Sequence, residues 1–540
     1  MKKLISFICV ISLVCVSLAG CGKSSSKAKK IAVQGEDGPL APYSETLTLS
    51  MLHENNVGVT YPGEDTAADN AVTRFFKEKL NIAFNMDWTV DSGNYSEQLD
   101  LAIASNTDLP DIFTADRQQV YTLAASGLIY DMEDIFEKYA SDSLKETVKF
   151  ADSQGIKSGT VLDGLYGLPL TNDVGDGASM VFIRKDWLNK LGLKEPTSLN
   201  ELKNIAKAFV DNNVSGNKNG TLGISMAKDM GFTLDVVANA CGAYPDLWVN
   251  DGNGKLTYGS LSSNMKNALQ YLNELYGGGL INKEFAAQDT AKMAQYVAQG
   301  RLGIFIGPFW YNNNYIINNL TADSNAEWVV VNNLPLNSGE KVACRAWNTT
   351  YKWLVVNKKC GNPEAAVKLM NLWYEMWQGQ YADWYFSLQN SEQYKTVDLK
   401  KYSPIFFDPP LKNCKLGVAL REAVASGDSS ALNPEGLYDF DQLMLKDNSA
   451  IYRSAMLTWY GSFEKLNSTY SSFVYDLYQG PKDTAFSTIE NTLDEYEATT
   501  FTDIIMGKKD IAYFDEFVKQ WKSQGGDTLT ENVNEWYGKQ

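Results

Sequence analysis

The residues of this chain that could do chemistry favour ligand binding over bond breaking. The sequence holds one histidine, His53, and no HExxH or GxSxG motif, and Gly254-Lys255 is followed by Leu256 and so does not complete a P-loop. Aromatic residues are abundant, with 13 Trp and 29 Tyr. Such rings offer flat apolar faces to a ligand, and carboxylates, amides or guanidinium groups beside them can fix its polar groups.

Aromatic side chains follow or precede two strand-like runs in the second half of the chain. Trp310 follows the apolar run 302–306 within a Pro-Phe-Trp-Tyr-Asn segment that is hard to bury whole. Arg345 and Trp347 come shortly before the strand-like run 353–356. Since open α/β sheets bind ligands beyond the ends of their strands, we predict that Trp310 stacks on a ligand and that Arg345 and Trp347 face a cleft.

Polar side chains near the N-terminus are the second group of candidates. They follow two runs, 46–52 and 109–113, that have the composition of strands. These ligand-binding candidates are His53, Glu54, Thr114 and Asp116. A lone histidine is more often structural than functional, and an aspartate after a strand is often a plain solvated carboxylate.

The elements that must position these residues alternate between strands and helices. Further strand-like runs cover 82–86, 181–183 and 328–331. Helices are expected over 69–80 and 265–276, from a capping box at Ser198 and Glu201, and from Asn362-Pro363. Alternation of this kind predicts an α/β architecture, with helices dominating the stretch from about 451 to 521.

The first residues have the parts of a secretory signal. Lys2 and Lys3 precede an apolar run over 4–16, which is too short for a permanent membrane span. Ala19-Gly20 directly before Cys21 resembles the lipobox of bacterial lipoproteins, in which the cysteine is acylated and becomes the mature N-terminus. We expect a signal peptide over 1–20, lipidation at Cys21 and a lipid-anchored flexible linker over 21–44, because the residues after Cys21 are small, polar and basic.

Charge and cysteine content exclude several classes of protein. The formal net charge is −17, or −19 without Lys2 and Lys3, which argues against nucleic acid as a partner and against broad contact with anionic lipid. No CxxC occurs, so a zinc or redox site is not expected. The pairing of Cys241, Cys344, Cys360 and Cys414 stays open.

Several segments, in order along the chain, resemble extracellular solute-binding proteins (family 1) of carbohydrate ABC importers, in particular the large lipoproteins of Gram-positive bacteria. Residues 101–112 are similar to the family's "lASGDLPDI" and residues 163–169 to its "dGkiYGLP". Residues 183–193, followed by Pro196-Thr197, are similar to "iRKDWLdkLGlk.P.T". The segments around 275–285, 505–518 and 534–537 resemble "LYkeGLIdpEF", "ImGk" with "fD.fv", and "NeWy".

This resemblance implies a two-lobed, periplasmic-binding-protein-like fold with a hinge, an interlobe ligand cleft and a helix-rich C-terminal part. We expect lobe 1 over 45–172, lobe 2 over 173–343, a return to lobe 1 with an insertion over 344–460, and C-terminal helices mainly of lobe 2 over 461–540. The implied ligand is a carbohydrate, whose apolar ring faces suit aromatic side chains. The implied partners are ABC permease subunits and, through the lipid, the outer face of the cell membrane; we expect a monomer.

A loop after the second helix of lobe 2 needs separate weighing as a calcium site, since some relatives carry an EF-hand-like loop there. Asp211, Asn213, Ser215 and Asn217 alternate as in such loops. The twelfth position is Leu222 instead of a bidentate glutamate. We therefore expect a turn-rich loop without metal and no cofactor.

Two other functions remain open from the sequence. A surface-anchored glycosidase needs two carboxylates across one bond, and with 65 Asp and Glu residues the sequence cannot test this. A lipoprotein that senses a ligand or mediates adhesion could use the same fold. Because recognised catalytic motifs are absent, we predict a binding protein and not an enzyme.

Overall fold

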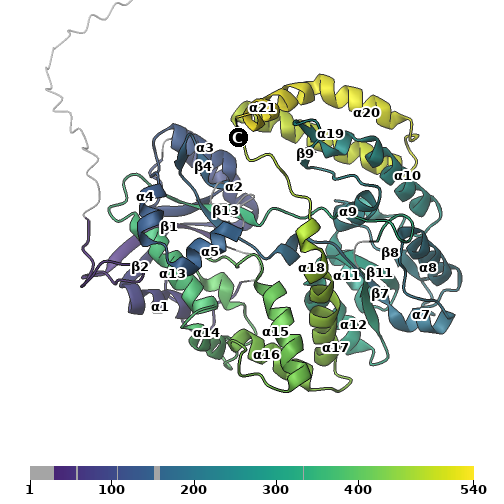
Figure 1. Ribbon diagram of the computed structural model, residues 1–540, viewed down its shortest axis with the longest axis horizontal. Helices are drawn as coiled ribbons and strands as arrows, with labels where there is room; N and C mark the ends of the chain where they lie inside the picture. The colour runs from purple at the N-terminus through teal and green to yellow at the C-terminus, as the bar shows by residue number, and fades with distance from the viewer. Residues whose placement is uncertain (1–29, 56–58, 106, 151–157, 332–333, 540) are drawn as a thin grey trace, which may run out of the picture.

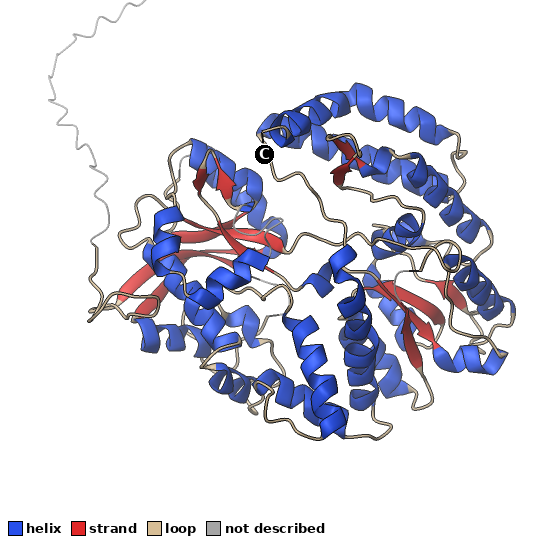
Figure 2. Cartoon of the chain, in the orientation of Figure 1, coloured by secondary structure: helices blue, strands red, loops and turns tan. Residues whose placement is uncertain are grey.

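Figure 1 shows the computed structural model of the chain, which describes residues 30–55, 59–105, 107–150, 158–331 and 334–539. The expected signal over 1–20 and Cys21 lie outside the described residues. Two mixed β-sheets form the centres of two lobes, with helices around each sheet (Figure 2). The expected α/β class with two lobes is confirmed. Within the described part of the chain, no helix combines the length and the apolar composition that crossing a membrane requires.

The first lobe is built on a five-stranded sheet in the order β2-β1-β3-β13-β6. β1 is parallel to β2 and β3, and β13 is antiparallel to β3 and β6. The strands are β1 (Leu47–Asn55), β2 (Ile82–Asp91), β3 (Ile112–Ala115), β6 (Leu168–Thr171) and β13 (Thr350–Val356). The helices are α1 (Ala71–Leu80), α2 (Tyr95–Ala104), α3 (Arg117–Ala125), α4 (Glu133–Tyr139), α5 (Asp142–Phe150), α13 (Glu364–Trp377) and α14 (Ala382–Gln389). A short hairpin pairs β4 (Thr160–Val161) with β5 (Gly164–Leu165).

The second lobe is built on a four-stranded sheet in the order β12-β7-β11-β8. Its strands are β7 (Met180–Arg184), β8 (Leu222–Ile224), β11 (Leu302–Gly307) and β12 (Trp328–Val331), and β9 (Trp248–Asn250) pairs separately with β10 (Leu256–Tyr258). Its helices are α7 (Lys185–Leu191), α8 (Leu199–Asp211), α9 (Gly231–Ala240), α10 (Ser263–Gly277), α11 (Thr290–Ala298) and α12 (Ile317–Ala322).

Both faces of the second sheet are buried, as the side chains of β7 show. Val181 and Ile183 join a core with the C-terminal helices α19 (Thr484–Ile505), α20 (Tyr513–Trp521) and α21 (Asp527–Tyr537). Met180 and Phe182, which point to the other face, join a core that includes four later helices. These are α15 (Lys412–Ser426), α16 (Pro434–Met444), α17 (Ala450–Met456) and α18 (Phe463–Thr469). Of the segment expected over 344–460, residues 354–407 contribute to the first-lobe core.

The chain start after residue 30 is fixed to the first lobe. The Asn362 side chain accepts from the Ile31 amide and donates to the Ile31 carbonyl, both at 2.8 Å. Lys368, wholly buried, donates to the Ala41 carbonyl at 2.9 Å. Asn362 does not cap α13 as expected, because its side-chain amide bonds Ile31 and α13 begins after Pro363. Residues 30–44 belong to the segment expected to act as a linker.

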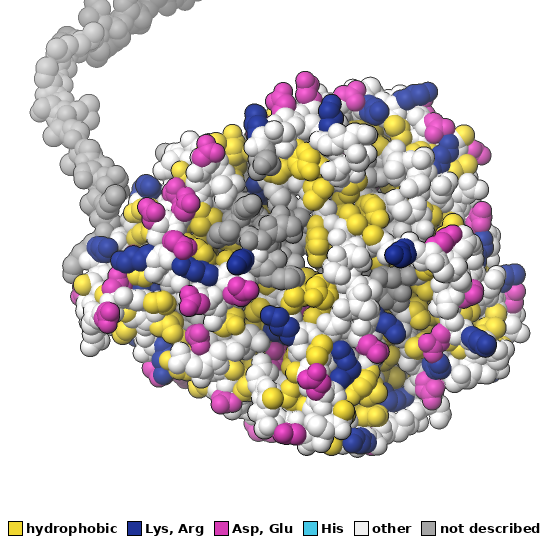
Figure 3. All heavy atoms as spheres, viewed as in Figure 1, with side chains coloured by type: hydrophobic (Ala, Val, Ile, Leu, Met, Phe, Trp, Pro, Cys, Tyr) yellow, Lys and Arg dark blue, Asp and Glu magenta, His cyan; other side chains and the backbone are white. Residues whose placement is uncertain are grey.

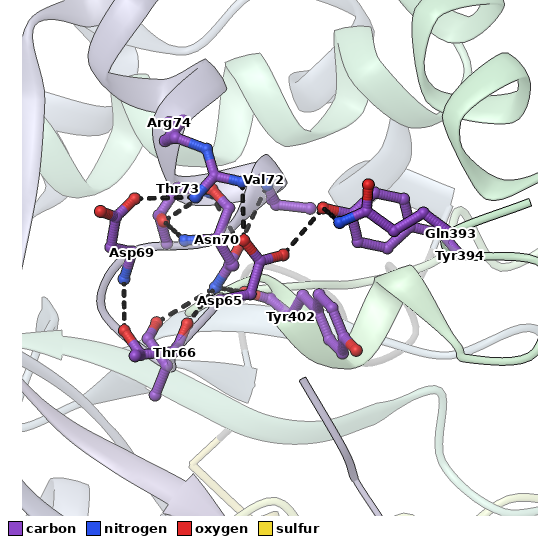
Figure 4. A network of polar contacts seen from close by, with 11 residues as sticks. Asp65, Thr66, Asp69, Asn70, Val72, Thr73, Arg74, Gln393, Tyr394 and Tyr402 are labelled. Atoms are coloured by element: carbon purple, nitrogen blue, oxygen red, sulfur yellow. Dashed lines mark hydrogen bonds and ion pairs between the residues drawn. The ribbon is translucent and has the colours of Figure 1, made fainter. Parts of the chain in front are cut away.

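Helix caps show where local sequence rules hold. α1 starts directly after Asn70, whose side-chain oxygen accepts from the backbone amides of Val72 and Thr73. Its side-chain Nδ2 donates to the Tyr402 carbonyl at 3.1 Å (Figure 4). Ser198 caps α8 by accepting from the Glu201 amide. The Glu201 carboxylate accepts from the Thr197 amide at 2.7 Å and not from Ser198, so only half of the expected capping box forms.

Candidate functional site

The second-lobe cavity, of about 400 Å³, brings three predicted residues together. Trp310, Arg345 and Trp347 all line it, next to the N-terminus of α9 and the end of β11. Trp310 follows β11 as expected, is half-buried and packs edge-on to Tyr311 with ring centroids 4.7 Å apart. Gly307 ends β11, and a Cβ there would lie 2.1 Å from the Tyr311 ring, so a glycine is needed for this close packing.

Trp347 is the exposed aromatic of the second-lobe cavity. Its indole stacks on the Phe232 ring with centroids 5.3 Å apart and planes at 30°, yet 48% of the residue is exposed. One face is therefore supported by Phe232 while much of the ring stays accessible. Gly177 packs against Trp347, because a Cβ at Gly177 would lie within 3 Å of the Trp347 backbone and side chain.

Arg345 is held between two carboxylates of the same cavity. Its Nη1 lies 2.9 Å from Asp235 and its Nη2 3.6 Å from Asp246, and its side chain is largely buried. Burial raises the pKa of Asp235 to about 6, although the Arg345 guanidinium acts in the opposite direction. The Arg345 amide donates to Asn239 at 3.0 Å, so both backbone and side chain fix the residue against α9.

The first-lobe cavity, of about 280 Å³, collects three of the polar candidates at the first sheet. His53 and Glu54, near the end of β1, line it together with Thr114 of β3. Burial lowers the pKa of His53, with Glu54 acting against it, so the imidazole is neutral at pH 7. Glu54 forms an ion pair with Lys352 of β13, whose ammonium lies 4.8 Å from the centre of the Tyr95 ring.

The two cavities lie near each other across the chain segments that connect the lobes. Trp347 lines one cavity and Tyr351 the other, and four residues span at most about 14 Å. Between them the Asn172 amide donates to the Thr349 carbonyl at 2.7 Å, which ties two crossing segments together. The face seen in Figure 3 is hollowed between the lobes, and acidic and basic side chains are interspersed over the face as a whole.

Asp116 stands apart from the other candidates. It lines neither cavity; its carboxylate caps α3 by accepting from the Gln119 amide at 2.8 Å, and it also accepts from Ser96 at 3.2 Å. Thr114, which we expected after a strand, lies inside β3 and donates to the Tyr95 hydroxyl at 3.0 Å.

The loop weighed as a calcium site uses its oxygens internally. Asn213 Oδ1 accepts from Thr221 at 3.0 Å, and Asp211 pairs with Lys207 at 2.7 Å. In the described ranges, no three His, Cys, Asp or Glu side chains gather as metal ligands would. Among the described residues, Cys241, Cys360 and Cys414 are free thiols.

Several cavity residues were not predicted from the sequence. They are Asp229, Phe232, Asp235 and Asp246 in the second lobe, and Tyr351 and Lys352 in the first. Of these, Asp235 could have been found from the sequence, because it is the only charged residue in the apolar helix α9. It is buried in the structure, and a buried carboxylate requires a charged partner. Asp246 adopts a left-handed φ of 62° in a turn that carries no motif.

Known proteins resemble this chain over much of its length. The family model described as bacterial extracellular solute-binding protein matches residues 61–376. The polygalacturonan/rhamnogalacturonan-binding protein YtcQ of Bacillus subtilis is 27% identical over 297 residues, which is 54% of each chain. The fructooligosaccharide ABC transporter substrate-binding protein FusA of Streptococcus pneumoniae is 27% identical over 347 residues, covering 61% of this chain and 60% of FusA. The chain thus spans between half and two thirds of the length of these relatives.

A solved structure extends the likeness to the whole fold. The HMO-binding solute-binding protein of Bifidobacterium longum infantis aligns over 92% of this chain and 99% of its own, with a TM-score of 0.63 and 18% identity. At that identity the match supports the two-lobed fold.

Proposed function

The chain belongs to the family of bacterial extracellular solute-binding proteins, and we propose that it captures an oligosaccharide between its lobes and delivers it to an ABC transporter permease. The observation that carries the proposal is Trp347, an exposed indole supported from behind by Phe232 within a cavity beside the lobe crossings. Sugar rings have apolar C–H faces that pack on such rings, while their hydroxyls need hydrogen-bonding partners.

Polar groups from both lobes supply those partners in the proposal. Asp246 and Arg345 stand on the second-lobe side, and His53, Glu54 and Lys352 on the first-lobe side. Because the cavities belong to different lobes, closure about the crossing segments would enclose a ligand and expel water, a motion known for two-lobed binding proteins. The closed form is the one we expect to dock on the permease.

The named relatives support a carbohydrate but leave its charge open. One relative is named for polygalacturonan, which is anionic, and the other for fructooligosaccharide, which is neutral. Both names describe glycans longer than a monosaccharide, and this supports an oligosaccharide as the ligand.

Anchoring to the outer face of the membrane is the second part of the proposal. It is supported by the Ala19-Gly20-Cys21 sequence behind a secretory signal and by the family's extracellular role. We expect Cys21 to be acylated. Expression of a Cys21→Ala variant in a Gram-positive host should release the protein from the membrane fraction into the medium; retention of the variant would contradict lipid anchoring.

Binding is tested by a thermal-shift screen of the purified protein against a panel of oligosaccharides, followed by uptake assays. At least one glycan should raise the melting temperature in a concentration-dependent way. Cells that lack the gene should then fail to take up that glycan until the wild-type gene is restored. Normal uptake in the deleted strain would refute the transport role, even if binding is found.

A further inference from the structure

The charges around the second-lobe cavity are unbalanced in one direction. Three carboxylates line it, those of Asp229, Asp235 and Asp246, and among the described lining residues Arg345 is the only cation. That cation is already engaged, since its guanidinium lies 2.9 Å from Asp235 and 3.6 Å from Asp246. Asp229 is exposed, and the Asp246 side chain is 59% exposed, so two negative charges remain at the mouth of the cavity.

Further acidic side chains lie behind Asp246. Burial, and after it Glu490 and Asp246, raise the pKa of Asp494 to about 6. Burial and then Asp246 also raise the pKa of Glu497, a buried carboxyl that this shift keeps largely protonated. Burial is the larger cause of both shifts, and the neighbouring carboxylates add to it because each weakens the ionisation of the others, so an anion arriving beside the ionised carboxylates meets the same repulsion.

The first-lobe cavity offsets this charge only in part. Lys352 is neutralised by Glu54, and the imidazole of His53 is uncharged at neutral pH because burial lowers its pKa. Lys401 is the one remaining cation that lines this cavity in the described chain, and it is exposed. Together the two cavities therefore carry more negative than positive charge, and neither presents a buried, unengaged guanidinium or ammonium to a carboxylate.

We infer that the cleft selects neutral oligosaccharides and rejects glycans built from uronic acids. The inference rests on the proposed function and adds the chemical class of the ligand. Trp347 and Trp310 would accept the ring faces of either class, whereas the carboxylate on C5 of each uronate would face Asp229 and Asp246, where Arg345, the cation that lines this cavity in the described chain, is already engaged. If the carboxylates approach to within about 6–8 Å, two such repulsions weaken binding by about 10- to 100-fold, the range expected for a partly solvated site.

The test measures calorimetric affinities of the full mature chain for two panels at low and physiological salt. The neutral panel holds fructo-, malto-, cello-, xylo- and α-1,4-galacto-oligosaccharides, and the anionic panel holds tetragalacturonate and oligomannuronate. Binding confined to neutral glycans supports the inference. A uronate oligomer that binds as tightly as the best neutral glycan overturns the inference and leaves the proposed function standing. Absence of binding to both panels overturns both.

A matched pair of variants tests the electrostatic cause. Asp246→Asn removes one carboxylate, and asparagine tolerates the left-handed φ of 62° that Asp246 adopts. Asp163, an exposed aspartate with the same φ of 62°, lines neither cavity and serves as the control for Asp163→Asn. The ratio of tetragalacturonate affinity to neutral-glycan affinity should rise at least about threefold in Asp246→Asn and stay constant in Asp163→Asn. An unchanged ratio in Asp246→Asn would refute the charge-based selection.

Discussion

Replacing Trp347 by alanine should weaken ligand binding while leaving the fold intact. A tryptophan offers up to about 250 Å² of surface, so an exposed fraction of 48% leaves about 120 Å² accessible. A sugar ring that covers half of this removes about 60 Å² from water, worth about 1.5 kcal/mol at 25 cal/mol per Å². Loss of the ring should therefore raise Kd by about 10- to 30-fold.

The assay is isothermal titration of wild type and Trp347→Ala with the same glycan, together with thermal melts. Stability should change little, because the indole is half-exposed and stacks on the Phe232 ring at the cavity surface. Tyr438→Ala is the matched control, since Tyr438 is 53% exposed on α16 and lines neither cavity. The reasoning fails if Trp347→Ala binds within twofold of wild type, or if Tyr438→Ala loses as much affinity.

Three further predictions concern single side chains. Trp310→Ala should weaken glycan binding by about 1–3 kcal/mol in titration, as for other buried aromatic anchors, and unchanged affinity would remove Trp310 from the site. Arg345→Gln should lower the free energy of unfolding in urea by about 3–5 kcal/mol, because it leaves buried Asp235 without its partner; a loss below about 1 kcal/mol would contradict that dependence. Burial, reinforced by Glu435, raises the pKa of Asp439 to about 7. The folded chain therefore holds the carboxyl proton of Asp439 more tightly than the unfolded chain does. The stability that this proton contributes is lost as pH rises from about 4 to about 7. Between pH 5 and pH 8, the free energy of unfolding of Asp439→Asn should rise by about 1–2 kcal/mol relative to that of wild type, as measured by denaturation curves. If the unfolding free energies of both proteins change in parallel with pH, Asp439 does not titrate in this range.

Local signals predicted the elements well where the sequence pattern was dense. The apolar run at 302–306 became β11, and helical spacing over 265–276 became α10, because burial of a periodic face fixes each element. The role of Asp116 was also readable: Asp116 and Gln119 have the spacing of a capping box, and the structure forms one at α3. That local role explains why Asp116 does not reach a cavity.

Contacts between distant segments account for what the sequence could not predict. Glu54 and Lys352 are 298 residues apart, and only the pairing of β13 into the first sheet brings them together. The support of Trp347 by Phe232 likewise joins a crossing segment to α9. No local pattern encodes such neighbours, so the aromatic and cationic candidates could be named while their partners could not.

The most direct test of the central claim is to titrate the mature protein with a neutral oligosaccharide and then analyse the recovered sugar. The account predicts saturable binding of one oligosaccharide per chain, with the sugar recovered intact after prolonged incubation. Cleavage of the sugar at catalytic levels, or failure of every neutral glycan to bind, would contradict a capture protein whose cleft holds a neutral oligosaccharide.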